Sequence, residues 1–325
     1  MLDMQQEKDF DSFVHVLLST YNGEVYLKEQ LDSIFAQSFS RFRLFIRDDG
    51  SSDNTLRILS SYLEEHPEAA RKTAVLSDDP EHPERKNANL GYMGSFWRLL
   101  EAVPDAKYYA FSDQDDVWFP EKLERCVRLL DSQDEPVPHL AFSSYYYTDE
   151  NLQILHPAPE PNMPLELRDV MFYVPIFGFS MVFNHRLRQE ALKTTDRTDL
   201  PHDTWLQMIA AGLGKISYES TPLAYYRRHG AAVTKSNASL TAAIRNWLSR
   251  EIFGNYMKTR HFMMERFWQE HGTECSPNDQ EFLRLYLNRP LTPSIWFRRF
   301  AYRKPLRPSK GGDLALRILF FLNRW

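Results

Sequence analysis

The sequence predicts an α/β fold, because short apolar runs alternate along the first 130 residues with stretches of helical periodicity. An order of strand, helix, strand, helix implies a parallel sheet joined by right-handed crossovers. Clusters of polar and acidic residues follow several of the apolar runs directly, which is where open α/β sheets bind their ligands. With 325 residues, the chain is long enough for one large domain or two modest ones.

Two strand–helix units open the chain. Residues 13–19 and 42–46 are mostly apolar and predict buried strands, and each run stops at polar turn residues. Apolar side chains then recur at helical spacing in residues 24–37 and again in 56–63, where Asp53 is placed to cap the second helix. These two units predict the start of the parallel sheet.

The same pattern continues to residue 130 and then changes. The next expected elements are a weak strand at 73–76, a helix at 95–102, a strand at 108–111 and a helix at 120–130. Residues 1–130 therefore predict an α/β half-domain of the kind that binds nucleotides. The elements expected after His139 are a strand at 140–147, a proline-rich connector at 149–168, a loop and strand within 174–184, a helix at 204–211, and short strands at 215–218 and 223–226.

Beyond residue 239 the periodicity predicts helices only, at 240–270, 279–287, 294–302 and 314–325. From Trp296 onward, eight basic residues and one acid are interleaved with aromatic side chains. This pattern favours a helix that lies at a membrane interface. The alternative is a basic, solvated helical hairpin packed on the core.

The composition excludes several classes of protein. A formal net charge of -5 argues against a general nucleic-acid binder. Two cysteines, Cys126 and Cys275, are too few for a disulfide framework or a zinc site, which favours a reducing, cytoplasmic setting. Residues 1–11 lack a signal-peptide pattern, and no run of about 18 apolar residues predicts a spanning helix. We therefore expect any membrane association to be peripheral.

The most informative stretch is residues 111–118, with the sequence Phe-Ser-Asp-Gln-Asp-Asp-Val-Trp. Asp113, Asp115 and Asp116 place three carboxylates within four positions, directly after a predicted buried strand. Carboxylates packed so closely repel one another, and a bound cation relieves that repulsion. Taken alone, the stretch has an alternative interpretation as an acidic surface turn.

Four polar clusters, at residues 19–22, 48–53, 113–116 and 202–203, would meet along one edge of a parallel sheet. An acid pair after the second strand suits the hydrogen-bond donors of a base and a ribose. A second acid group on a later strand suits a divalent cation that bridges a diphosphate. The sequence has neither Gly-x-Gly-x-x-Gly after the first strand nor a P-loop, which argues against a dinucleotide oxidoreductase. These features predict a site for a nucleotide diphosphate held by a metal.

Five motifs together resemble those of family 2 glycosyltransferases, which are inverting enzymes that use nucleotide sugars. The motifs are Ser19–Asn22, Gln37-Ser38, Arg47–Thr55, Asn89–Gly91 and Asp113–Trp118. The resemblance implies the GT-A nucleotide-diphospho-sugar transferase fold, an α/β fold with a Rossmann-like mixed sheet flanked by helices, and a helical C-terminal extension. The residues of these motifs are most similar to those of bacterial rhamnosyltransferases of cell-wall and capsular polysaccharide assembly.

The same resemblance implies a division of the chain. A GT-A domain is expected at residues 1–235, with a donor half at about 13–130 and an acceptor half at about 131–235. A helical region rich in basic and aromatic residues is expected at 236–325.

The resemblance also implies which residues bind the nucleotide sugar. Thr20 and either Asp49 or Asp48 would hold the base, with Tyr21 beside it. Gln114, inside the acidic stretch, is assigned to the same nucleotide-sugar site.

For the diphosphate and the metal, the resemblance points to two segments. Asp113 and Asp115 match the Asp-x-Asp motif, so Asp115 is the expected ligand of Mn²⁺ or Mg²⁺, with Asp113 beside it near the ribose. Arg227 and His229 match an Arg-x-His pattern near the diphosphate, and His229 is a further candidate metal ligand.

Asp203 stands where the family places its general base, usually in a Glu-Asp pair. Here His202 precedes it, and the role of His202 stays open. An inverting transfer needs one carboxylate to remove a proton from the acceptor hydroxyl as it attacks the sugar. A cation stabilises the departing nucleotide diphosphate.

The sequence thus predicts an inverting glycosyltransferase. The expected donor is dTDP-rhamnose, and the expected acceptor is a hydroxyl of a growing, lipid-linked bacterial polysaccharide at the inner face of the cell membrane. Three alternatives remain: transfer of another hexose from a UDP-sugar, a nucleotidyltransferase, and an inert membrane scaffold of the same pathway.

Overall fold

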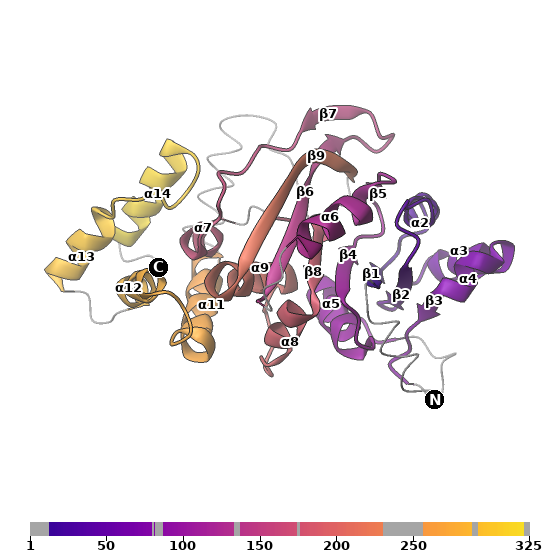
Figure 1. Ribbon diagram of the computed structural model, residues 1–325, viewed down its shortest axis with the longest axis horizontal. Coiled ribbons are helices and arrows are strands. Elements are labelled where there is room, and N and C mark those ends of the chain that lie inside the picture. The colour runs from indigo at the N-terminus through magenta and orange to yellow at the C-terminus, as the bar shows by residue number, and fades with distance from the viewer. Residues whose placement is uncertain are drawn as a thin grey trace.

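The computed structural model shows a mixed sheet with helices packed on both faces (Figure 1). The residues it describes are 13–79, 81, 87–132, 137–173, 176–229, 256–287 and 292–321. Within them nine strands form one sheet, in the order β3-β2-β1-β4-β8-β6-β9-β5, with β7 paired to β6. The strands are β1 (Val14–Thr20), β2 (Phe42–Asp48), β3 (Thr73–Val75), β4 (Tyr108–Ser112), β5 (Val117–Trp118), β6 (His139–Thr148), β7 (Ile154–Pro157), β8 (Met181–Asn184) and β9 (Lys215–Arg227).

The strand directions bring both halves of the chain to one edge of the sheet. β1 pairs in parallel with β2 and β4, and β2 pairs in parallel with β3. β8 runs antiparallel to both of its neighbours, β4 and β6, and β6 pairs in parallel with β9. The two reversals cancel, so β6 and β9 point in the same direction as β1, β2 and β4. Their carboxyl ends therefore lie along the same edge.

Alternation along β1 sends its side chains into two cores, one on each face of the sheet. Val14, Val16 and Leu18 belong to one apolar cluster, with buried side chains of α2, α3 and α6, and Leu17 belongs to another, with α5, α8 and α9. The helices of the sheet-bearing region are α2 (Leu27–Phe35), α3 (Thr55–Glu65), α4 (Pro67–Lys72), α5 (Gly91–Ala102), α6 (Lys122–Asp131), α7 (Leu167–Phe172), α8 (His185–Leu192) and α9 (His202–Leu213), with a 3₁₀ turn at Gly178–Ser180.

The C-terminal helices extend the second of these cores. They are α11 (Tyr256–His271), α12 (Pro277–Leu287), α13 (Pro293–Phe300) and α14 (Lys310–Phe321). Phe172 in α7 packs its ring against Phe282, Tyr286 and Phe320, with centroid distances of 5.3 to 5.8 Å. Met263 of α11 is buried in the same cluster as the sheet residues. The division of the chain near residue 235 stays a prediction.

Most of the predicted strands and helices are confirmed, with shifts at their ends. α5 begins at Gly91 and α9 at His202, each a few residues earlier than expected. The two strands expected at 215–218 and 223–226 are one strand, β9, because register shifts opposite Ser143 and Ser144 of β6 let the pairing continue past Pro222. The elements α4, α7, α8, β5 and β7 were not predicted. The part of the helix expected at 240–270 that precedes Tyr256 lies outside the described residues.

Among the described helices, none combines the length and the apolar character that a membrane span requires.

A buried histidine in β1 should make stability depend on pH. His15 packs against the rings of Phe45 and Tyr109, and burial, together with the nearby Arg43, lowers its pKa from 6.5 to about 4. The unfolded chain therefore binds more protons between these two values, so the stability of the fold falls as the pH drops through that window.

We expect His15→Phe to remove part of this pH dependence. Between neutral pH and pH about 4, the wild type should lose on the order of 2 kcal/mol more stability than the variant. Thermal denaturation across that range measures the difference, with His156→Phe on the exposed strand β7 as the control. If the stability of the wild type and that of His15→Phe fall equally between neutral pH and pH about 4, this account is wrong.

Candidate functional site

The first part of the site lies where β1 and β2 end. Thr20 donates through Oγ1 to Asp48 Oδ1 (3.0 Å), and its carbonyl accepts from the Asp49 N–H (2.7 Å). The Asp48 carboxylate also accepts from the backbone N–H groups of Gly50 (3.1 Å) and Ser51 (2.8 Å). Gly50 has a φ of +82°, a left-handed conformation that glycine adopts without strain. The structure thus joins Thr20, Asp48 and Asp49 into one hydrogen-bonded unit.

A buried arginine holds Asp49 in place. Arg47 has no exposed side-chain surface, and its guanidinium donates to Asp49 Oδ1 (2.5 Å) and Asp78 Oδ2 (2.7 Å). The Leu90 N–H also donates to Asp49 Oδ1 (2.8 Å). Sequence reasoning gave Arg47 no role. No sequence signal singles it out, because Arg43 in the same strand is also charged and is exposed.

Gln114 ties the acidic stretch after β4 to the end of β1. Its Oε1 accepts from the Tyr21 N–H (2.8 Å), and its Nε2 donates to the Tyr21 carbonyl (2.9 Å). A Cβ atom at Gly23 would lie 2.2 Å from Gln114 Oε1, so a larger residue there would displace this amide. The Gln114 amide therefore fixes the backbone of Tyr21, whose own side chain is 48% exposed.

Asp115 and His229 are in direct contact. His229 Nε2 lies 2.8 Å from Asp115 Oδ2, although the two residues are 114 positions apart in the chain. Strand β9 delivers the histidine, since it ends at Arg227, beside β5 of the acidic stretch. The His229 ring also packs on Tyr26, with a centroid distance of 4.8 Å. The Asp-x-Asp motif and the Arg-x-His pattern therefore meet at the sheet edge.

Arg227 stabilises the contact between Asp115 and His229. Its Nε donates to the Asp115 carbonyl (3.0 Å), its Nη1 donates to the Glu150 carbonyl (2.5 Å), and its Nη2 pairs with the Glu29 carboxylate. The side chain is only 3% exposed, and the guanidinium lies 4.4 Å from the centroid of the Tyr26 ring. These contacts hold the backbone of the acidic stretch. A contact between Arg227 and a diphosphate stays a prediction.

Three carboxylates converge at this edge from different parts of the chain. Burial, followed by the charges of Asp115 and Asp203, raises the pKa of Asp113 to about 7. Asp203 reaches the same place from the first turn of α9. Tyr92 in α5 lies nearby, with its ring centroid 6.5 Å from that of His202, and burial, followed by the charges of Asp203 and Asp113, raises its pKa. The predicted base and the predicted metal-binding stretch are thus brought together.

Asp116, for which no role was predicted, is a buried residue that supports the fold of the site. Its Oδ1 accepts from the Arg227 N–H (3.3 Å), and burial, with the charges of Asp115 and Asp113, raises its pKa well above the ordinary value. Lys122 is buried on the same side, with its Nζ 5.0 Å from the centroid of the Trp118 ring. Asp116 therefore holds the acidic stretch against β9. Unlike Asp113 and Asp115, it is fully buried.

His202 and Asp203 differ although they are adjacent. Asp203 Oδ1 accepts from the Thr204 N–H (2.6 Å) at the start of α9. His202 is 3% exposed and packs its ring against Phe96 (4.4 Å) and Phe111 (4.7 Å). Burial lowers the pKa of His202 to about 4, so its ring is neutral at neutral pH. His202 thus packs beneath the site, where it supports Asp203.

In the described part of the chain, no group of three or more His, Cys, Asp or Glu side chains converges closely enough to hold a metal ion. The Asp115–His229 pair supplies one oxygen and one nitrogen donor, and Asp113 is close enough to interact with Asp115 electrostatically. Divalent cations such as Mg²⁺ are often bound by one or two carboxylates together with substrate phosphates and water. The donor set therefore fits a cation whose coordination the substrate completes.

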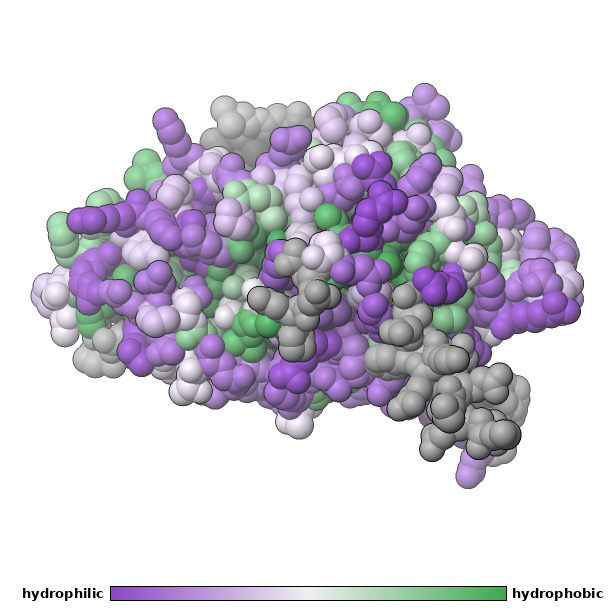
Figure 2. Space-filling model, viewed as in Figure 1, coloured by the Kyte–Doolittle hydropathy of each residue, from purple (hydrophilic) through white to green (hydrophobic). Residues whose placement is uncertain are grey.

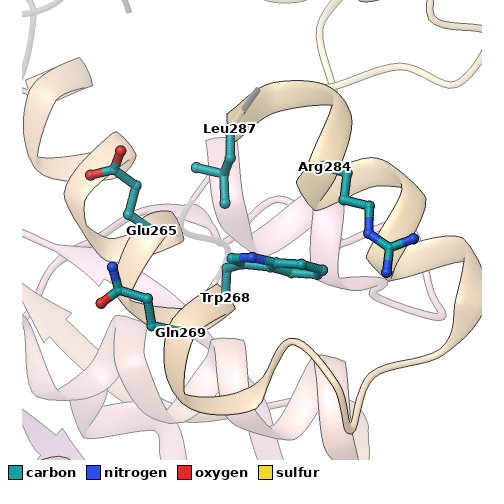
Figure 3. A pocket seen from close by; sticks show the side chains of 5 residues that line it. All are labelled: Glu265, Trp268, Gln269, Arg284 and Leu287. Atoms are coloured by element: carbon teal, nitrogen blue, oxygen red, sulfur yellow. The ribbon is translucent and has the colours of Figure 1, made fainter. Parts of the chain in front are cut away.

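A hollow between α11 and α12 contains none of the predicted site residues. It has a volume of about 480 Å³ and is lined by Glu265, Trp268, Gln269, Arg284 and Leu287 (Figure 3). The Arg284 guanidinium lies 5.4 Å from the centroid of the Trp268 ring. The hollow does not gather several acids, as the sheet edge does, and we do not assign the chemistry to it.

Comparison with known proteins places this geometry among the enzymes that transfer sugars. Residues 15–194 match the family model described as glycosyl transferase family 2, which covers more than half of the chain. The chain belongs to glycosyltransferase family 2. It is therefore a glycosyltransferase, as the sequence motifs predicted.

Individual relatives agree with this assignment. An uncharacterized glycosyltransferase of Nostoc sp. is 29% identical over 239 residues, which are 70% of this chain and 69% of the relative. The dTDP-rhamnosyl transferase RfbG of Shigella flexneri is 34% identical over 115 residues, which are 35% of this chain and 36% of that protein. The match to RfbG thus spans about a third of either chain.

Solved structures confirm the predicted GT-A fold. Residues 1–349 of TarS from S. aureus superpose with a TM-score of 0.57 at 16% identity, covering 96% of this chain and 81% of that chain. The same fragment has also been solved in complex with UDP-GlcNAc.

We expect the Gln114 amide to matter for nucleotide binding although it is bonded to the backbone of Tyr21. Gln114→Ala should lower the affinity for a nucleoside diphosphate about 3- to 10-fold, because binding then has to supply part of the order that two hydrogen bonds of about 0.5–1.5 kcal/mol each gave Tyr21. Calorimetry with UDP and dTDP measures this change, and Gln269→Ala, on the exposed face of α11, is the matched control. An unchanged affinity would show that Tyr21 needs no such support.

Proposed function

We propose that this glycosyltransferase is an inverting enzyme that moves L-rhamnose from dTDP-rhamnose to a hydroxyl of a growing, lipid-linked bacterial polysaccharide. The observation that carries the inverting mechanism is the position of Asp203 near the acidic stretch. Its neighbour His202 packs on Phe111 (4.7 Å), two residues before Asp113, and Asp203 and Asp113 interact electrostatically. One carboxylate from α9 thus faces a carboxylate pair that follows β4. This is the arrangement expected when a base activates the acceptor on one side and a diphosphate leaves on the other.

Asp203 acts as the general base in this proposal. The Thr204 N–H fixes its Oδ1 at 2.6 Å, and its Oδ2 has no hydrogen-bond donor among the described residues. It lies in the first turn of α9, among the backbone N–H groups that begin the helix. Asp203 Oδ2 would accept the proton of the acceptor hydroxyl as that oxygen attacks the sugar.

The donor nucleotide occupies the ends of β1 and β2 in this proposal. Thr20, Asp48 and Asp49 would hold the base, with the exposed ring of Tyr21 beside it. Gln114 contributes by fixing the backbone of Tyr21.

A divalent cation, Mn²⁺ or Mg²⁺, would be held by Asp115 and His229, with Asp113 beside them. Bound there, it would stabilise the negative charge on the departing nucleotide diphosphate. The chain's own part is to keep Asp115 and His229 in contact, which Arg227 does by binding the Asp115 carbonyl.

The identity of the sugar rests on two supports. The acidic motifs resemble those of bacterial rhamnosyltransferases, and the aligned stretch of a dTDP-rhamnosyl transferase is 34% identical. The second candidate is another hexose carried by a UDP-sugar, which the fold shared with TarS also accommodates.

Peripheral binding to the inner face of the cell membrane is supported by the C-terminal helices. Phe297 and Phe300 of α13 and Leu314 and Ile318 of α14 are each more than a third exposed. Figure 2 shows apolar residues among strongly polar ones at the end of the molecule that α13 and α14 form. Exposed apolar side chains next to basic ones favour an anionic lipid surface.

The donor is tested by a thermal-shift screen over dTDP- and UDP-sugars, followed by a transfer assay with and without Mn²⁺ or Mg²⁺. We expect dTDP-rhamnose to give the largest shift, and the metal to increase that shift in the wild type but much less in Asp115→Ala. A larger shift with a UDP-hexose would select the second candidate. If no nucleotide sugar is bound or cleaved, the chain is the inert scaffold.

Asp203→Asn should lower the transfer rate about 10²- to 10⁴-fold, because the amide cannot accept the proton. Donor affinity should stay within about twofold, since the proposal gives Asp203 no contact with the donor. Rate measurements and calorimetry on the same preparation separate the two effects, and Asp199→Asn, at an exposed position near α9, is the control. A large loss of nucleotide affinity in Asp203→Asn would argue against the role of a base.

The membrane proposal predicts that Phe297→Ser combined with Ile318→Ser lowers the fraction of protein bound to anionic liposomes several-fold. The exposed pair Ile154 and Leu155 on β7, changed to serine in the same way, is the matched control. Flotation measures both variants. If the helix variant floats like the wild type, the C-terminal helices do not form the membrane contact.

A further inference from the structure

A cavity of about 490 Å³ lies between the end of β6, the proline-rich connector and residues 305–308. Its volume is in the range of small-molecule sites, about 300–1,000 Å³. None of the residues assigned above to the donor, the metal or the base lines it. The cavity therefore needs an explanation of its own.

Aromatic rings dominate the walls of the cavity. Tyr145, Tyr147, Tyr173, Phe177 and Tyr218 all line it. A pyranose ring presents a face of C–H groups that packs on an aromatic ring, and a rim of hydroxyls that needs hydrogen-bond partners. Tyrosine offers both kinds of contact, since its ring is apolar and its hydroxyl is polar.

One buried hydroxyl in the wall has no internal partner. Ser143 lines the cavity, is 1% exposed, and its Oγ makes no hydrogen bond to any other residue that the structure describes. A buried hydroxyl without a partner destabilises the fold. After a change of the Ser143 rotamer towards the cavity, a ligand that brings its own hydroxyls would satisfy it.

The charges of the wall do not suit an anion. The cavity is lined by the acids Glu160, Glu166 and Asp169. Two arginines also line it, and both are already engaged. Arg168 pairs with Glu166 and donates to the Pro305 carbonyl (2.7 Å), and Arg307 donates through Nε to the Phe172 carbonyl (3.2 Å). A phosphate would therefore meet more negative charge than free positive charge, whereas a neutral sugar would not.

The cavity adjoins both parts of the reaction site. Phe177 precedes Gly178, at which a Cβ would lie 3.8 Å from Asp203 Cβ. Phe177 also stacks on Tyr226, with a centroid distance of 5.4 Å. Tyr226 in turn precedes Arg227, the residue that holds the Asp115 carbonyl. Phe177 is thus next in sequence to the residue beside the general base, and its ring stacks on the residue that precedes Arg227.

We propose that this cavity binds a neutral saccharide unit of the acceptor, adjacent to the unit whose hydroxyl is glycosylated. The inference rests on the proposed function, since it requires the acceptor to approach Asp203. It also gives the C-terminal region a part in acceptor choice, because residues 305–308 form one wall and are held there by Arg168.

The test is saturation-transfer NMR on the full chain with four probes: methyl α-L-rhamnoside, methyl β-D-glucoside, methyl β-D-galactoside and chitobiose. At least one probe should receive saturation from the wild type. That signal should fall at least fivefold in Ser143→Ala and in Tyr173→Ala. Phe262→Ala on α11 is the matched control, since Phe262 is 40% exposed and Tyr173 is 36% exposed.

Ser143→Ala separates binding from folding. Because the Ser143 hydroxyl has no internal partner, its removal should leave the melting temperature unchanged or raise it while the saccharide signal is lost. Tyr173→Ala removes an aromatic wall at an exposed position and provides a second, independent readout.

The outcomes distinguish this inference from the proposed function. If no probe binds, or if both variants bind as the wild type does, the inference is wrong. The proposed function then still stands provided that the thermal-shift screen detects a nucleotide sugar. If neither nucleotide sugars nor saccharides bind, both are wrong.

Discussion

Repulsion between like charges at the carboxyl edge of the sheet is the constraint on which this structure depends. Asp113, Asp115 and Asp116 are close in sequence, and burial, followed by the charges of Asp115 and of Asp203 in α9, raises the pKa of Asp113 to about 7. Arg227 lies behind this group and binds its backbone at the Asp115 carbonyl, so it does not screen the carboxylates from one another. Asp115 contacts His229, and Asp113 and Asp203 have no ion pair among the described residues, so the front of the site gathers acidic groups that a bound cation would stabilise.

The contact between Arg227 and the acidic stretch depends on a distant part of the chain. Val117 and Trp118 form the two-residue strand β5, which pairs with Tyr225 and Ala224 of β9 and so sets the register between the acidic stretch and Arg227. Two residues alone make a weak strand, and buried Asp116 reinforces the pairing through the Arg227 N–H. β9 is in turn held by its long parallel pairing with β6. Contacts from the second half of the chain therefore stabilise the donor site in the first half.

The sequence was informative wherever a local pattern determines local structure. The strands before Asp48 and Asp113 are apolar runs followed by polar residues, and the parallel order of strand and helix places both residues at the same edge. Contacts between distant segments could not be read in this way. The Gln114–Tyr21 clamp spans 93 residues and the His229–Asp115 contact spans 114, and neither leaves a periodic signal. His202 is a similar case, because only the packing against Phe96 and Phe111 shows that it is a neutral core residue.

The direction of β8 decides whether the two halves can work together. β8 is antiparallel to β4 and to β6, and these two reversals give β4 and β6 the same direction. If β8 were parallel to either β4 or β6, then β6 would run in the opposite direction. Tyr145 and Tyr147 would then lie at the opposite edge of the sheet, far from Asp203. The observed topology instead places the aromatic cavity and the acidic stretch on the same side, with Phe177 between them. An acceptor bound in the cavity would thus reach the base without any rearrangement of the sheet.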